Sequence, residues 1–499
     1  PRTVSLAAQL PALQVVVPLL TAPLLVLLRG PSLAWAAATA ASLMSFAIAV
    51  ALTAAVLGQG ALHYEMGGWQ APFGITLDID ALGVLMLLLI TGASSLALVS
   101  GRESLARDID PGRLHLFYAA WLIAVAGLSG IAVTGDAFNV FVFMEISSLA
   151  SYVLIAAGPD RRALTATFKY LIMGTIGATF YLIGVGLVYM MTGTLNFADM
   201  DVRVAEVTDQ LPILVAAGFI TVGLALKAAV FPLHLWLPNA YTYAPHIVTA
   251  FLAACSTKVA IYVLLRFDFF VFQGNLDQHA LQFSMFLAPL ALLGILVGSA
   301  VAMVEGNLKR LLAFSSVAQI GYILLGASFA SEAGLTAAVA HMFNHALAKG
   351  GLFLAVAAIA MRVGGVRLTD IGGVGRRMPW TTAGLVVAGA SLVGIPGTAG
   401  FVSKWLLLQA AFAQGTLGIM AAVIVVLSSL AAVMYVWRIV EQAYFGEPAA
   451  EGVTTGEAPW PLLAGVWMVA LANVYFGVLP ELPVALAESA ATELLRHLP

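Results

Sequence analysis

Hydrophobic positions in this chain form long uninterrupted runs, separated by charged residues or by glycine and proline. Most runs reach the length of about 20 residues that a helix needs to cross a bilayer, and several exceed it. They predict about fourteen membrane-spanning helices, at residues 8–29, 33–58, 80–101, 113–134, 137–158, 164–192, 210–243, 245–267, 280–303, 308–329, 332–362, 380–413, 416–446 and 459–480. The pattern is therefore typical of an all-α polytopic membrane protein.

Two stretches near the beginning need separate interpretation. The segment Leu62–Asp80 alternates like a strand and contains turn glycines, so we expect a small hairpin outside the membrane. The first hydrophobic run has no small-residue cleavage site before a polar mature chain, so we expect a retained helix.

Composition supports the membrane assignment and narrows the chemistry. Of the 499 residues, 61% are hydrophobic and 9% are charged, whereas soluble proteins carry about a quarter charged residues. The single cysteine, Cys255, cannot form an internal disulfide, and iron–sulfur clusters normally need four thiolates. We expect no cofactor and, because the sequence has no basic patch, no nucleic-acid partner.

The distribution of basic residues predicts an orientation. One set of alternate loops holds fourteen of the 22 lysines and arginines, namely Arg29, Arg102, Arg107, Arg113, Arg161, Arg162, Lys169, Lys309, Arg310, Arg362, Arg367, Arg376, Arg377 and Arg438. The opposite loops and the termini hold four. The first set should be cytoplasmic, which leaves both termini outside the cytoplasm.

The remaining four basic residues fall inside hydrophobic runs: Lys227, Lys258, Lys349 and Lys404. Glu145 is the acid placed deepest in a run. A lysine at the centre of a membrane helix costs about 2.5–3.5 kcal/mol, so such residues usually have a function. Snorkelling to the interface is the alternative, most applicable to Lys404, which lies near the helix break at Pro396.

Buried lysines suit proton transfer. Burial favours the neutral amine, whereas a nearby carboxylate favours the charged ammonium. A carboxylate that moves closer or further away therefore switches the lysine between holding and releasing a proton. Glu145 and Lys227 are the candidate switched pair.

Two of the predicted helices should be interrupted. Proline removes a backbone donor, and free backbone at membrane depth is tolerated where it lines a cavity. Breaks in corresponding places of two halves are typical of inverted-repeat transporters, although two ordinary proline kinks would give the same pattern. The residues concerned are Pro232 and Pro238 after Lys227, and Gly394, Pro396 and Gly397 before Lys404.

A third group occupies one helix face. His341, His345 and Lys349 stand at i, i+4 and i+8, within an arc of about 80° and about 12 Å along the axis. Histidine titrates near neutrality, so this face could relay protons. A packed polar seam is the alternative. A metalloprotease-type zinc site is disfavoured because Met342 replaces the glutamate, and haem would need facing histidines, so we expect no metal.

Other polar residues fit a hydrated path or ordinary helix packing. Ser315, Gln319 and Tyr322 share a face of one helix, and His234 follows Pro232.

Four segments carry a family resemblance: Glu145 with its surroundings, LKAAVFPLHLWLPNAYTYAPHIVTAFLAACSTKVAIYVLLR (226–266), NLKRLLAFSSVAQIGY (307–322) and HMFNHALAKGGLFL (341–354). Together they resemble the antiporter-like subunits shared by respiratory complex I and the Mrp cation/proton antiporters. Within that group, GTIGATFYLIGVGLVYMMTGTLNFADM (174–200) looks like the D-type polypeptide of the Mrp antiporters.

The resemblance implies an inverted pair of five-helix repeats. It divides the chain into residues 1–110 (three helices and the hairpin), 111–270 (helices four to eight), 271–446 (helices nine to thirteen) and 447–499 (a cytoplasmic loop and the last helix). It also implies roles along one proton path: Glu145 modulates Lys227, Lys258 bridges, the His341–His345–Lys349 face relays, and Lys404 is terminal. A glutamate replaces this last lysine in one complex I relative.

Three hypotheses follow. The first is the D-type component of a multisubunit sodium/proton antiporter in a bacterial inner membrane, a secondary transporter component with Mrp A, B, C, E, F and G type partners. The second is a proton-pumping subunit of a redox-driven complex such as complex I. The third is a structural membrane scaffold with incidental polar residues.

Overall fold

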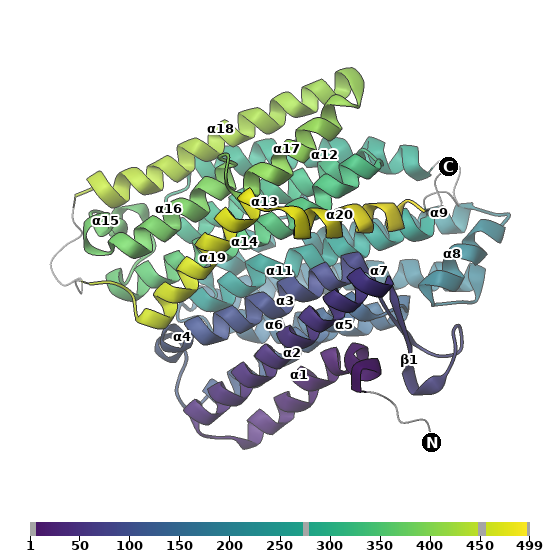
Figure 1. Ribbon diagram of the computed structural model, residues 1–499, viewed down its shortest axis with the longest axis horizontal. Helices are drawn as coiled ribbons and strands as arrows, with labels where there is room; N and C mark the ends of the chain where they lie inside the picture. Colours follow the sequence, from purple (N-terminus) through teal and green to yellow (C-terminus); the bar gives the residue numbers. More distant parts are fainter. Residues whose placement is uncertain (1–5, 273–278, 448–455, 497–499) are drawn as a thin grey trace.

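The computed structural model describes residues 6–272, 279–447 and 456–496, and almost all of this part is helical (Figure 1). It contains thirteen helices long and apolar enough to cross a membrane. Together with one broken pair of shorter helices, they match the fourteen predicted spans. The prediction of an all-helical polytopic membrane protein is confirmed.

The thirteen long helices are α1 (Leu10–Leu27), α2 (Pro31–Gln59), α3 (Ala81–Ser100), α5 (Leu114–Val133), α6 (Ala137–Ala156), α7 (Arg162–Thr192), α9 (Leu211–Ala228), α11 (His246–Leu265), α12 (His279–Val304), α13 (Leu308–Ser328), α14 (Glu332–Val363), α18 (Gly415–Phe445) and α19 (Trp460–Val478). The shorter helices are α4 (Arg102–Asp108), α8 (Phe197–Glu206), α10 (Trp236–Tyr243), α15 (Val374–Arg377), α16 (Pro379–Val393), α17 (Ala399–Phe412) and α20 (Glu481–Leu494).

The predicted hairpin is present and marks one end of the bundle. Strands β1 (Leu62–Glu65) and β2 (Thr76–Ile79) pair antiparallel, with Leu62 opposite Ile79. Helices α4 and α15 lie at the opposite end (Figure 1). We call these the hairpin end and the basic end, because the arginines of α4 and α15 belong to the positively charged set of loops.

The core of the bundle lies around α11, α13 and α14, and α14 packs against both of the others. Every side chain of α13 is buried except that of Arg310, which is intermediate. By contrast, α18 exposes large apolar side chains such as Leu417, Met420 and Leu427. Exposed apolar side chains are what a lipid-facing helix requires, so polar residues on the central helices lie in the protein interior.

Both expected helix breaks are present. Helix α9 ends at Ala228, and the chain passes through Pro232 before α10 begins at Trp236. Helix α16 ends at Val393, and Gly394, Pro396 and Gly397 form the turn that leads into α17. Gly394 and Gly397 have φ of +92° and +85°, a conformation in which a side chain would be strained.

Pro238 is not part of a break, contrary to the prediction. It is the third residue of α10, where it lies in the first helical turn. The backbone N–H groups of that turn have no partner within the helix, so the missing donor costs nothing there.

A similar backbone bridge occurs in each half of the chain. Asp136, just before α6, pairs with Asn196, which follows α7. Asn307, just before α13, pairs in the same antiparallel manner with Arg367, which follows α14. In each case the bridge joins the two outer ends of a consecutive helix pair.

Candidate functional site

Glu145 and Lys227 come together inside the first half of the bundle. Lys227 lies in the last turn of α9 and Glu145 in the middle of α6, with 3.6 Å between the Nζ and Oε1 atoms. The Lys227 side chain is 5% exposed and that of Glu145 is 29% exposed. The lysine also donates a hydrogen bond of 2.7 Å to Ser148 Oγ. The predicted pair is therefore within ion-pair distance.

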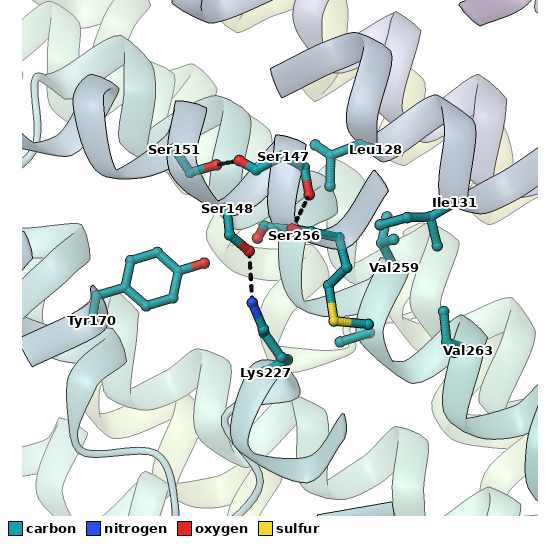
Figure 2. Close-up of a pocket in the computed structure, with 12 residues that line it drawn as sticks. Leu128, Ile131, Ser147, Ser148, Ser151, Tyr170, Lys227, Ser256, Val259 and Val263 are labelled. Carbon is teal, nitrogen blue, oxygen red and sulfur yellow. Dashed lines mark hydrogen bonds between the residues drawn. The ribbon is translucent and has the colours of Figure 1, made fainter. Parts of the chain in front are cut away.

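A cavity of about 30 Å³ lies beside Lys227, which is one of its lining residues (Figure 2). Its polar lining comes from serines of α6 and α11, from Lys227 and from Tyr170. One water molecule needs about 10–15 Å³, so the cavity has room for about two. The α6 serines are Ser147, Ser148 and Ser151, which are not among the predicted site residues, although Ser148 follows Glu145 by three residues and so shares its helix face.

An aromatic residue of α10 contacts the end of α9 where the helix is interrupted. The indole of Trp236 donates a hydrogen bond of 2.9 Å to the carbonyl of Leu226, one of the last carbonyls of α9. Its ring stacks on Tyr170 at 4.0 Å between centroids. Trp236 thus gives a second donor to a carbonyl that also accepts from the backbone N–H of Ala229, and it connects the break to the cavity wall.

Lys258 lies in the middle of α11 and is fully buried. Its ammonium donates to the carbonyl of Ala253, about one turn earlier in the same helix. Helix α11 packs against both α9 and α14. Lys258 therefore lies on the helix between the Glu145–Lys227 pair and the histidines.

His341, His345 and Lys349 share one face of α14, and all three are at most 2% exposed. The His341 ring contacts Gln319 Oε1 at 2.9 Å and Ser403 Oγ at 2.8 Å. The two histidine rings are nearly parallel at 6.1 Å. Both His345 ring nitrogens are buried without a hydrogen-bond partner among the described residues.

Lys349 completes this face at its other end. Its ammonium donates to the carbonyl of Leu312, at 2.7 Å, and to Ser315 Oγ. Helix α13 thus supplies polar partners to both ends of the relay: Ser315 to Lys349 and Gln319 to His341.

Lys404 is held at the second helix break. It lies in α17, and its ammonium turns back to the last carbonyls of α16, at 3.0 Å from Leu392 O and 2.9 Å from Val393 O. It also contacts Ser429 Oγ at 3.2 Å. Lys404 is 6% exposed, so it does not snorkel to an interface.

Tyr322 extends the contacts around Lys404. The lysine Nζ lies 5.1 Å from the centre of the Tyr322 ring, and the tyrosine hydroxyl donates to Ser428 Oγ at 2.6 Å. His234 is separate from these contacts. It is buried in the turn between α9 and α10, stacked on Phe231.

Lys309 is a buried lysine that was not among the predicted site residues, because its charge assigned it to a cytoplasmic loop. It is the second residue of α13, is 1% exposed, and donates a hydrogen bond of 2.6 Å to the carbonyl of Ala244. The predicted helix 308–329 already includes Lys309, and the side chain of Asn307 caps the start of that helix.

No group of three or more potential metal ligands occurs in the part of the chain that the structure describes. What the described residues provide instead is a set of ammonium, imidazole, hydroxyl and amide groups inside a helical membrane protein. The lysine amines and the histidine imidazoles can bind and release protons.

The fold and these buried residues define a polytopic membrane protein with ionisable groups along its interior. Residues 134–431 match the family described as "NADH:quinone oxidoreductase/Mrp antiporter, TM", and the chain belongs to that family. It is 39% identical over 492 residues to the N subunit of the NADH-quinone oxidoreductase of Desulforudis audaxviator, covering 95% of this chain and 97% of that protein.

Two further comparisons connect the chain with cation antiporters. It is 30% identical over 485 residues to the D component of the Na(+)/H(+) antiporter of Bacillus subtilis, covering 97% of this chain and 96% of that one. A chain in the Mrp complex from a Dietzia species superimposes with a TM-score of 0.89 at 28% identity, with 98% of both chains covered.

Proposed function

We propose that this chain is the proton-translocating subunit of a multisubunit monovalent cation/proton antiporter, of the D type. Protons move along the buried line of Glu145, Lys227, Lys258, the His341–His345–Lys349 face and Lys404. The observation that carries the proposal is the ion pair between Glu145 and Lys227, whose lysine lines a cavity large enough for water. The likeness to the D component of a sodium/proton antiporter over nearly the whole chain supports the choice of transport process.

The ion pair gives the line a switch. Two unit charges about 4 Å apart attract by about 4 kcal/mol at the effective dielectric constant of such sites. While Glu145 stays close, Lys227 therefore keeps its proton. When the carboxylate moves away or is neutralised, the ammonium loses that stabilisation and can release its proton toward α11 through water in the cavity.

Further along, the histidines provide proton acceptors. His341 and His345 lie one turn apart, and the His345 ring nitrogens can take part in transfer between His341 and Lys349. Lys404 ends the line at the carbonyl end of α16. The cation that is exchanged need not bind in this chain, since the described residues form no carboxylate cluster for it.

The arrangement of the two halves supports the domain boundaries. We propose inverted repeats at residues 111–270 and 271–446, each containing one backbone bridge and one broken helix, with residues 1–110 and 447–499 outside them. Residues 448–455 of the predicted loop lie outside the described residues. We place the basic end in the cytoplasm of a bacterial cell and both termini on the other side.

A second candidate function has its own support. The 39% identity to the N subunit of an NADH-quinone oxidoreductase favours a redox-driven complex in which the same line pumps protons. In that case the chain would be a translocase subunit and not part of a secondary transporter.

Purification of the native assembly separates the two functions. Co-purification with small antiporter subunits, together with proton movement after a sodium or potassium pulse in vesicles, is the expected result. Co-purifying flavin- or quinone-binding subunits and proton movement driven only by electron transfer would favour the second function. Vesicles that move no protons under either driving force would contradict both.

A further inference from the structure

A second group of ionisable side chains lies at the basic end, outside the line described above. It forms where α4, the turn between α10 and α11, and the start of α13 meet. Lys309 is almost fully buried there and donates to the carbonyl of Ala244, the residue that directly follows α10. A buried lysine at this depth, bonded to a neutral carbonyl, is unexplained by the line from Lys227 to Lys404.

Asp108 and His246 are its neighbours. Asp108 ends α4, is partly exposed, and accepts a hydrogen bond from the backbone N–H of His246. Its Oδ2 atom is buried without a hydrogen-bond partner in the described ranges, and so is Nδ1 of His246. Burial raises the pKa of Asp108, while the charges of Lys309 and Arg107 act in the opposite direction.

The first turns of α13 connect this group to the interior. Lys309 precedes Leu312 by three residues, or about 4.5 Å along the helix axis. The Leu312 carbonyl accepts from Lys349, which also binds Ser315 Oγ. One helix therefore carries a buried amine near the basic end and, one to two turns deeper, the two groups that hold Lys349.

We propose that Asp108, His246 and Lys309 form a proton port that connects the basic end of the molecule to Lys349 along α13. The inference rests on the proposed proton-translocating function. Asp108 takes a proton from water at its exposed edge. The carboxylic acid then gives that proton to the neutral amine of Lys309, which leaves a carboxylate and an ammonium, and His246 Nδ1 is an alternative acceptor.

The competing explanation is a structural clasp. In that case Asp108 and Lys309 only hold the turn between α10 and α11, through the backbone N–H of His246 and the carbonyl of Ala244. Both explanations predict damage when the side chains are removed, so the test must measure proton supply.

Asp108→Asn is the informative variant, because asparagine keeps an oxygen acceptor for the His246 N–H but cannot carry a proton. The matched control is Glu103→Gln, since Glu103 is an exposed acid on the same short helix. The native assembly is placed in vesicles with the basic end facing the medium. Proton uptake after a cation pulse is then measured at several external pH values and buffer concentrations.

The port predicts that Asp108→Asn slows uptake about tenfold or more at low buffer concentration, as expected when a proton-transfer group is lost. Raising the concentration of a small mobile buffer should restore most of the rate, because the buffer can deliver protons directly. The parent and Glu103→Gln should be independent of buffer concentration. Lys309→Met should be slow at every buffer concentration.

Three outcomes would overturn the port while leaving the proposed function intact. They are a parental rate in Asp108→Asn, a loss that buffer does not restore, and an equal loss in Glu103→Gln. A parent assembly that takes up no protons would instead contradict the proposed function, and the port with it.

Discussion

The two broken helices place their lysines on opposite sides of the break. Lys227 precedes the first break, in the last turn of α9, and faces the carboxylate of Glu145 on another helix. Lys404 follows the second break, in α17, and turns back to the carbonyls that end α16. The first lysine thus has an ionisable partner and the second has backbone partners.

This difference indicates different roles. The carbonyl end of a helix carries a partial negative charge of about half a unit that does not titrate or move far. Lys404 is therefore stabilised as a cation by a fixed partner. Lys227 instead faces a carboxylate on another helix and lines a cavity, so we infer that Lys227 is the lysine whose proton can be switched.

The largest expected effect is that of Lys227→Ala. Without the amine the line is interrupted at its switch, and cation-driven proton exchange in vesicles should fall about a hundredfold or more. Lys169→Ala is the control, because Lys169 is an exposed lysine on the neighbouring helix α7. Assembly should persist in both variants. Exchange at the parental rate in an assembled Lys227→Ala complex would refute the lysine line.

Lys404→Gln should damage stability more than Lys227→Ala does. It weakens the bonds to Leu392 O and Val393 O, and each buried polar group left unpaired costs about 1–3 kcal/mol. A lower melting temperature of the purified assembly, together with about tenfold slower exchange, is expected. Lys404→Arg should recover most of the stability. If Lys404→Gln melts like the parent, the backbone carbonyls are not its essential partners.

Glu145→Gln should slow exchange by less than Lys227→Ala, about tenfold, because the proton carrier remains but loses its switch. The rate should also depend differently on pH from that of the parent. Glu305→Gln is a suitable control, since Glu305 forms its ion pair with Arg310 outside the line. Superimposable pH–rate profiles of Glu145→Gln and the parent would show that the two residues are not coupled.

The sequence predicts well those features that depend on local spacing. The spans follow from run length, both breaks follow from glycine and proline, and the shared face of His341, His345 and Lys349 follows from helical periodicity. The sequence predicts a break at Pro238 that the structure does not have, because the effect of a proline depends on where the new helix begins. A proline in a first turn leaves that helix intact.

Contacts between helices could not be predicted in the same way. The partners of Lys404 are backbone carbonyls, which every residue possesses, so no sequence pattern marks them. The charge of Lys309 groups it with the basic loop residues, whereas its burial depends on the position of the turn between α10 and α11. The α6 serines give no specific signal in the sequence, because serine is common in membrane helices.

Ser148→Ala should have the smallest effect on proton exchange. It tests how much this serine, which lines the cavity, contributes to the exchange rate. The hydroxyl is 2.7 Å from Lys227 Nζ, while the Glu145 carboxylate at 3.6 Å remains available to the ammonium. A hydrogen bond to a charged group contributes about 1.5–3 kcal/mol, but the carboxylate can take over the ammonium here, so exchange should change by less than about tenfold without loss of assembly. The double variant Ser148→Ala/Glu145→Gln should lose more than the sum of the single losses in free energy, because both partners of one ammonium are then removed. If the two losses are strictly additive, Ser148 acts on the cavity and not through Lys227. The carboxylate of Glu145 would then be the one partner that distinguishes Lys227, at the first break, from Lys404, at the second.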